Sequence, residues 1–161
     1  MNEKKRFHEI LEDFTNAMLI TWNEKQPPHA RPMRVAEVTE ASEVWFVTDR
    51  QSAKVEELQA NPSVLITMQG GSKFLSMTGT ISPSDSASDI DRLWSEAWKI
   101  WFPEGKTDPS ILLLRLKPDF GEFWDNSGTN RWRYLYEAGK AYFQGTEIDA
   151  ENLNANAKVR L

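Results

Sequence analysis

Cysteine is absent from this chain of 161 residues, and histidine occurs only twice, as His8 and His29. Without cysteine there are no disulfides, zinc–thiolate sites or thiol nucleophiles. Two histidines on different predicted elements cannot form a conventional metal site alone. The H-E-x-x-H and G-x-S-x-G motifs are also missing, which argues against zincin and α/β-hydrolase chemistry. The sequence therefore offers no familiar set of acid, base and nucleophile.

Long hydrophobic runs are missing as well. No segment approaches the roughly 20 apolar residues that a spanning helix needs, and the N-terminus, MNEKKRFHEILEDF, lacks the apolar core of a signal peptide. The formal net charge is −5, without a concentrated basic segment, which argues against general binding to nucleic acids. We expect a soluble, cytoplasmic protein that binds neither nucleic acid nor membrane.

The composition is that of a single folded domain with a different C-terminal end. A chain of this length can bury one sizeable core. Aromatic residues make up 11% of the chain, which indicates large buried surfaces or a planar ligand. From Gly145 the sequence becomes polar and rich in asparagine. We therefore expect a domain over residues 1–145 and a polar tail over residues 146–161.

Hydrophobic patterning predicts a mainly β fold with flanking helices (α+β). The predicted helices cover residues 3–14, 52–60, 84–101 and 131–143, and the predicted strands cover residues 17–22, 30–39, 44–48, 63–69, 73–82, 111–117 and 119–126, the last two meeting at a Lys117-Pro118 corner. Strands joined by hairpins favour a small antiparallel barrel over a parallel sheet.

Several residues carry more specific expectations. Pro32 cannot donate to a β ladder, so it should lie at an edge, at a bulge or where a ligand replaces a strand. Gly79 suggests a bulge or a close backbone approach. The 84–101 helix should be capped by Ser86 and present one apolar face. In the 131–143 helix, four residues should face inward: Leu135, Ala138, Tyr142 and Phe143.

The junction between strand 44–48 and helix 52–60 is the strongest candidate for chemistry. Ser52 is a favourable N-cap residue, and the unpaired amides of a first helical turn attract anions. Lys54 adds a full positive charge two residues later. Together these groups predict a cradle for a phosphate.

The order and spacing of several motifs carry a family resemblance. ARPM, FVTDRQSAK, ANPSV, MTGT, WFPEGKTDPSILLLRLKP and EFWD resemble the FMN-binding split barrels related to pyridoxamine 5'-phosphate oxidase, most of all the general stress protein branch. The resemblance covers nearly the whole chain. It implies a six- to seven-stranded antiparallel split β-barrel over residues 1–145, with FMN bound in a groove between the subunits of a homodimer.

The resemblance also implies a set of flavin-binding residues. Ser52 and Lys54 would bind the 5'-phosphate, helped by Arg31 or Arg50. The remaining contacts, with the ribityl chain, the ring or the dimer seam, would come from Arg31, Met33, Phe46, Val47, Thr48 and Trp124. Without the resemblance, Arg31 and Arg34 would be interpreted as exposed strand charges.

A cofactor that performs the chemistry itself suits a chain without an obvious acid, base or nucleophile. The first hypothesis is an FMN-dependent oxidoreductase of the general stress protein type. The alternative is a non-catalytic protein that binds or carries flavin, FMN or FAD, in the stress response. Pyridoxamine phosphate oxidation fits less well, because the acidic, asparagine-rich tail departs from the basic and aromatic C-terminus of those oxidases. Use of deazaflavin or haem stays open.

Overall fold

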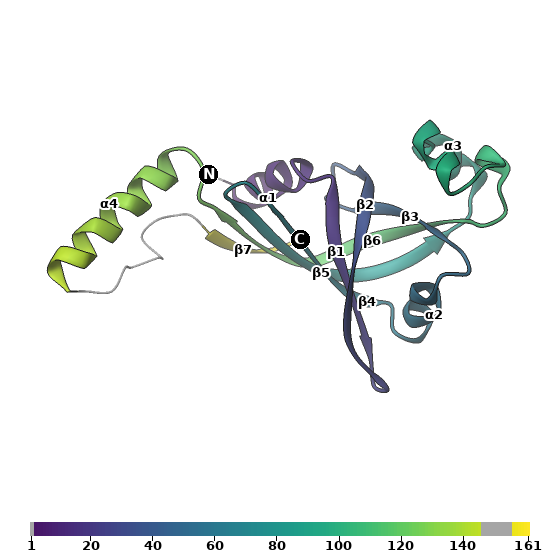
Figure 1. The fold of residues 1–161 in the computed structure, drawn as a ribbon, viewed down its shortest axis with the longest axis horizontal. Helices are drawn as coiled ribbons and strands as arrows, with labels where there is room; N and C mark the ends of the chain where they lie inside the picture. The colour runs from purple at the N-terminus through teal and green to yellow at the C-terminus, as the bar shows by residue number, and fades with distance from the viewer. Residues whose placement is uncertain (1, 146–155) are drawn as a thin grey trace.

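The computed structural model describes residues 2–145 and 156–161. Seven antiparallel strands form one sheet in the order β3-β2-β1-β4-β5-β6-β7, and an additional β3–β6 pairing closes it into a split barrel (Figure 1). The strands are β1 (Asn16–Asn23), β2 (Gln26–Val38), β3 (Val44–Asp49), β4 (Ser63–Gly70), β5 (Lys73–Ser84), β6 (Ile111–Asp125) and β7 (Asn156–Arg160). The expected split-barrel fold is confirmed.

Helices flank this barrel. They are α1 (Glu3–Glu12), α2 (Ala53–Ala60), α3 (Ala87–Leu93) and α4 (Thr129–Gln144), with 3-10 helices η1 (Glu96–Ile100) and η2 (Gly105–Thr107). None of the helices in the described residues is long and apolar enough to cross a membrane.

Strand β6 changes its partner part-way along its length. Residues 111–116 pair with β3, whereas residues 120–124 pair with β7. At the transition Pro118 lies opposite Gly79, where the β5–β6 register shifts. A Cβ at Gly79 would lie 2.2 Å from the Lys117 carbonyl oxygen, so only glycine fits. The bulge expected at Gly79 is confirmed, but the expected Lys117-Pro118 corner does not divide β6.

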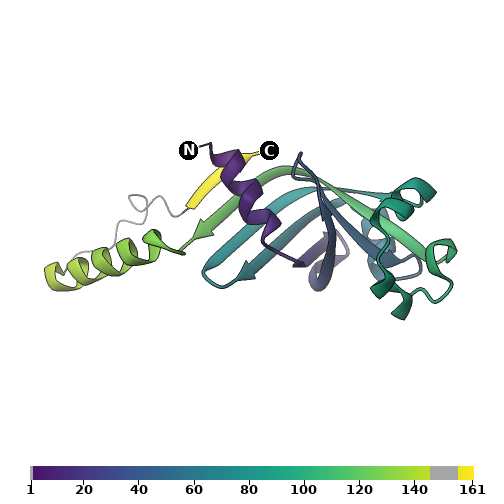
Figure 2. The same ribbon diagram turned by 90° about the horizontal axis from the view of Figure 1, so that it is seen from above.

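The main core fills the barrel and extends beneath α1. Asn2 caps α1 by accepting a hydrogen bond from the Lys4 amide, and Phe7 is fully buried. The Phe7 ring packs on Phe123, with ring centroids 6.5 Å apart. It also covers Gly121, where a Cβ would lie 2.3 Å from the ring. The amphipathic first helix therefore crosses β6 close to β7 (Figure 2).

The single helix expected over residues 84–101 is wrong. Strand β5 extends to Ser84, and α3 ends at Leu93 because Trp94 leaves the helical conformation (φ −52°, ψ 133°). The chain re-enters a helix only as η1, after the extended Ser95. Ser86 does cap α3, as expected, by accepting from the Asp89 amide. The break leaves Trp98 4% exposed but Trp101 59% exposed.

A second hydrophobic cluster joins this segment to the outside of the barrel. It contains Trp45, Ile90, Leu93, Trp98, Phe102, Ile111 and Leu113. The Trp94 and Trp98 rings meet edge to face, with centroids 5.7 Å apart. This cluster holds η1 against β3 and fixes one wall of the site described below.

The C-terminal helix differs from its expected packing. Helix α4 extends away from the barrel (Figures 1 and 2), and Leu135, Tyr142 and Phe143 are exposed rather than facing inward. Ala138 is half-buried. The first part of the expected polar tail, residues 146–155, lies outside the described residues, and residues 156–160 form β7 along β6.

Candidate functional site

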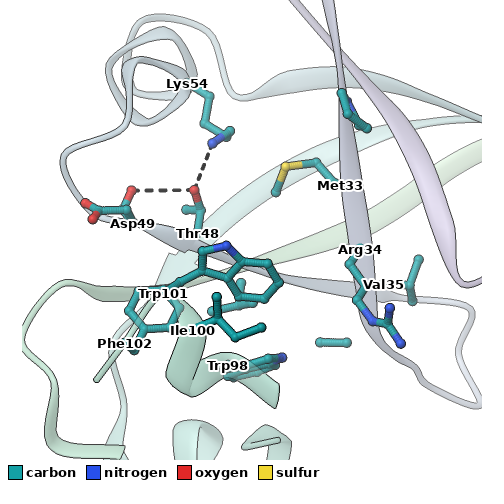
Figure 3. A pocket seen from close by; sticks show the side chains of 13 residues that line it. Met33, Arg34, Val35, Thr48, Asp49, Lys54, Trp98, Ile100, Trp101 and Phe102 are labelled. Atoms are coloured by element: carbon teal, nitrogen blue, oxygen red, sulfur yellow. Dashed lines mark hydrogen bonds between the residues drawn. The ribbon is translucent and has the colours of Figure 1, made fainter. Parts of the chain in front are cut away.

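A cavity of about 610 Å³ lies on the outside of the barrel, between β2, the end of β3, α2 and the η1 segment. Figure 3 shows Lys54 on one side of this cavity and Arg34 on another, with Trp98, Ile100 and Trp101 forming part of the wall. The lining residues are Pro32, Met33, Arg34, Val35, Ala36, Val47, Thr48, Asp49, Lys54, Trp98, Ile100, Trp101 and Phe102.

Pro32 helps to open this cavity. It pairs with Met18 of β1 on one side, but β3 pairs with β2 only from Val35 onward. The β2–β3 register then shifts between Val35 and Glu37. The free edge at Pro32 therefore faces the cavity, as expected for a proline that cannot donate to a ladder.

A cluster of donors forms the cationic end of the cavity. The Lys54 ammonium donates to Thr48 Oγ1 at 2.9 Å, and the Thr48 and Ser52 hydroxyls are 3.2 Å apart. Ser52 occupies the expected N-cap position of α2, but its hydroxyl makes no capping bond. Among the described hydrogen bonds, the amides of Ala53 and Lys54 have no backbone acceptor. These groups are arranged to donate to an anion.

The electrostatic environment of Lys54 favours the arrival of negative charge. Burial lowers the pKa of the Lys54 ammonium, and the nearby positive charge of Arg31 lowers it further. Asp49 and Glu57 oppose this shift without cancelling it. A bound anion would add the favourable charge that this ammonium lacks.

Arg31 lies behind the cavity wall rather than in it. Its guanidinium donates to the Glu57 carboxylate, to Thr21 Oγ1 at 2.7 Å and to His29 Nδ1 at 2.8 Å. Burial tends to raise the pKa of Glu57, but the hydrogen bond from Thr21 and the charge of Arg31 outweigh it, and the pKa is lowered. The Arg31 charge is therefore already compensated inside the fold.

Four of the residues expected to bind flavin line the cavity, and four do not. Met33, Val47, Thr48 and Lys54 are in the lining. The Ser52 hydroxyl is 3.2 Å from the hydroxyl of Thr48, which does line the cavity. Arg31 acts on the cavity only through its positive charge, which lowers the pKa of Lys54. The other two are farther away. Phe46 is fully buried in the barrel core, and Trp124 lies opposite Phe74 towards the far end of β6.

Four lining residues were not expected from the sequence to belong to the site: Arg34, Asp49, Trp98 and Ile100. Trp101 and Phe102, which are also absent from the expected contacts, line the cavity of their own chain as well. Ser95, a residue type favoured at N-caps, was a signal for the new helix start at η1, although its hydroxyl makes no capping bond in the structure. The described residues contain no cluster of three or more metal-ligating side chains.

Comparisons with known proteins agree with this architecture. A family model described as pyridoxamine 5'-phosphate oxidase like matches residues 2–149. A solved structure from Jannaschia sp. CCS1, assigned as a general stress protein 26, is similar over 100% of both chains, with 24% identity and a TM-score of 0.74.

Two further solved structures have the same fold. The general stress FMN/FAD binding protein from Xanthomonas citri is 28% identical, with a TM-score of 0.66 over 77% of this chain and 89% of that one. General stress protein 26 from Bacillus anthracis str. Sterne is 22% identical, with a TM-score of 0.67 over 76% of this chain and 94% of that one. None of the curated proteins matches the sequence.

Proposed function

The chain belongs to the pyridoxamine 5'-phosphate oxidase like family, and from that premise we propose that it binds a flavin, FMN, in the cavity beside α2. The observation that carries the proposal is the joining of a phosphate-sized donor cluster, Lys54 with Thr48 and Ser52, to an aromatic wall. The volume of about 610 Å³ falls in the range of small-molecule sites, roughly 300–1,000 Å³. The flavin-binding relative from Xanthomonas citri supports the same ligand class.

The donor cluster would hold the phosphate end of FMN. The 5'-phosphate would accept hydrogen bonds from Lys54, from the hydroxyls of Thr48 and Ser52 and from the first amides of α2. Arg31 lies behind this cluster, and because Glu57 compensates most of its charge, it would add only a weak residual attraction for the phosphate. The phosphate would lie at this end because Lys54 and the two hydroxyls come together here, whereas Arg34 lies on another side of the cavity.

The apolar end would hold the ring system. Met33 and Val47 line the cavity from the barrel side, and Trp101 lines it from η1. Main-chain groups around Phe46 on β3 would contact the flavin, because its side chain points into the core. Bound there, the flavin would supply hydride or electron transfer. The protein would bind and orient it.

We further propose a flavin-dependent oxidoreductase of the general stress protein type, with a non-catalytic flavin carrier as the second candidate. One observation favours the carrier. Asp49 is the only carboxylate among the residues lining this cavity, and it already accepts a hydrogen bond from the Gln51 amide at 2.7 Å. The lining therefore contains a single carboxylate that could move a proton, and this scarcity favours binding over turnover.

A homodimer forms part of this proposal. Ile100 and Trp101 are 79% and 59% exposed beside the cavity, and Phe74 and Phe120 are each 42% exposed on neighbouring strands of the sheet. A second copy would cover apolar surface of this kind, and it would bring its own Trp124 towards the flavin. Light scattering of the flavin-bound protein at micromolar concentration should give the dimer mass, and a stable monomer would contradict the proposal.

Titration of the purified protein tests flavin binding directly. FMN should bind tightly, FAD more weakly or equally, and riboflavin much more weakly, as measured by quenching of flavin fluorescence. No binding of any flavin in excess would overturn the proposal. Reduction of the bound flavin by a nicotinamide nucleotide would then favour the oxidoreductase, and a flavin that stays oxidised with several donors would favour the carrier.

A further inference from the structure

A second, smaller cavity adjoins the first and shares part of its wall. Its volume is about 380 Å³, and Arg34, Trp98, Ile100 and Trp101 line both cavities. Leu93 and Ser95 line only the smaller one. The two hollows are therefore neighbouring compartments, with Lys54 in the first and Arg34 at the boundary between them.

The lining of the second cavity has one positive charge and no negative charge. The Arg34 backbone belongs to the β1–β2 ladder, but its exposed side chain forms no ion pair or hydrogen bond among the contacts of the described residues. By contrast, Arg31, Arg50, Arg92 and Arg115 each bind a carboxylate. Two carboxylates belong to residues that adjoin the cavity lining in the sequence, and both already bind other side chains.

Glu37 and Glu96 are those two carboxylates. Glu37 binds Arg92. Glu96 accepts from the Trp94 indole at 2.9 Å and from Lys99 at 2.6 Å. Among the described residues the Arg34 guanidinium thus has no counter-ion, and its exposed position lets an anion from solution reach it.

The remainder of the second cavity is apolar and partly aromatic. Leu93 and Trp98 form its buried side, while Ile100 and Trp101 leave most of their surface exposed. Flat aromatic ligands gain most from such a wall, because indole rings stack with them or meet them edge to face. The cavity thus combines a surface for a planar apolar body with one guanidinium.

We propose that this second cavity binds an aromatic monocarboxylate next to the flavin, with its carboxylate on Arg34 and its ring against Trp98 and Trp101. A single guanidinium matches one carboxylate in charge and in its two parallel donors. A phosphate monoester carries about −1.5 to −2 charge at pH 7, which Arg34 alone would leave partly uncompensated. This inference rests on the proposed function, because it assumes that flavin occupies the first cavity.

The test compares 2-naphthoate with its neutral analogue 2-naphthamide by isothermal titration calorimetry, on protein saturated with FMN. The wild type should prefer the carboxylate by up to about fivefold, the upper limit for a charge pair made by an exposed arginine. Arg34→Gln should abolish this preference, and Arg34→Lys should retain part of it. Arg160→Gln removes an exposed arginine on β7 outside both cavities and should keep the full preference.

Each result decides the proposal. Equal affinity for the two compounds in the wild type, or an undiminished preference in Arg34→Gln, would overturn it while leaving flavin binding intact. An Arg34→Gln protein that loses FMN rather than 2-naphthoate would place Arg34 in the flavin site and also overturn it. If the wild type binds no FMN, the proposed function fails. The same titrations on flavin-free protein would then support the subsite if the preference depends on Arg34, and overturn it otherwise.

Discussion

Replacing Lys54 by alanine isolates the contribution of the proposed phosphate contact. The Lys54 ammonium is half-buried, bonded to Thr48 at 2.9 Å and deprived of part of its usual solvation. FMN carries the phosphate, whereas riboflavin has the same ring without it. Lys54→Ala should therefore weaken FMN much more than riboflavin.

The structure sets the size of this effect. A hydrogen bond to a charged group contributes about 1.5–3 kcal/mol, which corresponds to roughly 10- to 150-fold in affinity. Solvent reaches part of the Lys54 side chain, which favours the lower end, about 10- to 30-fold. Thr48, Ser52 and the α2 amides would still bind the phosphate, so some preference for FMN over riboflavin should persist.

Fluorescence titration of both ligands measures the difference. Lys73→Ala is the control. The Lys73 ammonium lies 2.5 Å from the Asp13 carboxylate, and neither residue lines the cavity. It should leave both affinities unchanged. Lys54→Arg keeps the charge and should recover part of the FMN affinity. Equal FMN affinity in the wild type and in Lys54→Ala would refute the phosphate cradle.

Three further predictions concern pH and stability. FMN affinity should rise as the pH increases through about 6, where a phosphate monoester gains its second charge. It should fall again at alkaline pH, earlier than for an ordinary lysine because the Lys54 pKa is lowered; riboflavin titrations should lack both limbs. Glu57→Gln should lower the free energy of unfolding by about 1–3 kcal/mol at pH 7. The Glu57 pKa is below its usual 4.5. Denaturant titrations should therefore show the full loss of stability above about pH 4.5, and a smaller loss as the pH falls through the folded-state pKa. Gly79→Ala should destabilise the protein by about 1–3 kcal/mol, since its Cβ would meet the Lys117 carbonyl at 2.2 Å. Gly139→Ala, in open space on α4, should instead be neutral or stabilising by up to about 1 kcal/mol in the same urea titrations.

Local sequence signals predicted the barrel well because each strand carries its own pattern. In β1, the buried residues Ala17, Leu19 and Thr21 alternate with more exposed neighbours. The helix predicted over residues 52–60 matches α2 to within one residue, and Ser52 occupies the N-cap position. Gly79 identified its bulge because only a residue without a side chain fits there. These features depend on a few adjacent residues.

The site depends on contacts between segments that are distant in the sequence, and local patterns do not indicate which of these segments meet. Whether Trp98 or Trp101 turns inward is decided by the break at Trp94 and by the packing of η1 on β3. The ion pair between Arg31 and Glu57 joins β2 to α2, so no local pattern predicts it. Phe46 is different: strand alternation alone indicates that it cannot share a face with Val47.

Helix α4 departs from its expected packing for another physical reason. Its apolar spacing is real, but spacing identifies a face and not what covers that face. Within the described structure Leu135 and Phe143 remain exposed. The inward orientation expected from the pattern would have required a surface that the barrel does not offer to this helix.

The change of partner along β6 has a consequence for the order in which the chain folds during synthesis. The barrel closes only when residues 111–116 pair with residues 44–49. Likewise, α1 can pack on Gly121 and Phe123 only after those residues have left the ribosome. A nascent chain that stops before β6 would therefore expose both the open edge of β3 and the apolar side of the first helix. Such long-range closure is slow and prone to aggregation, so the barrel cannot complete its fold until the last third of the chain has been synthesised.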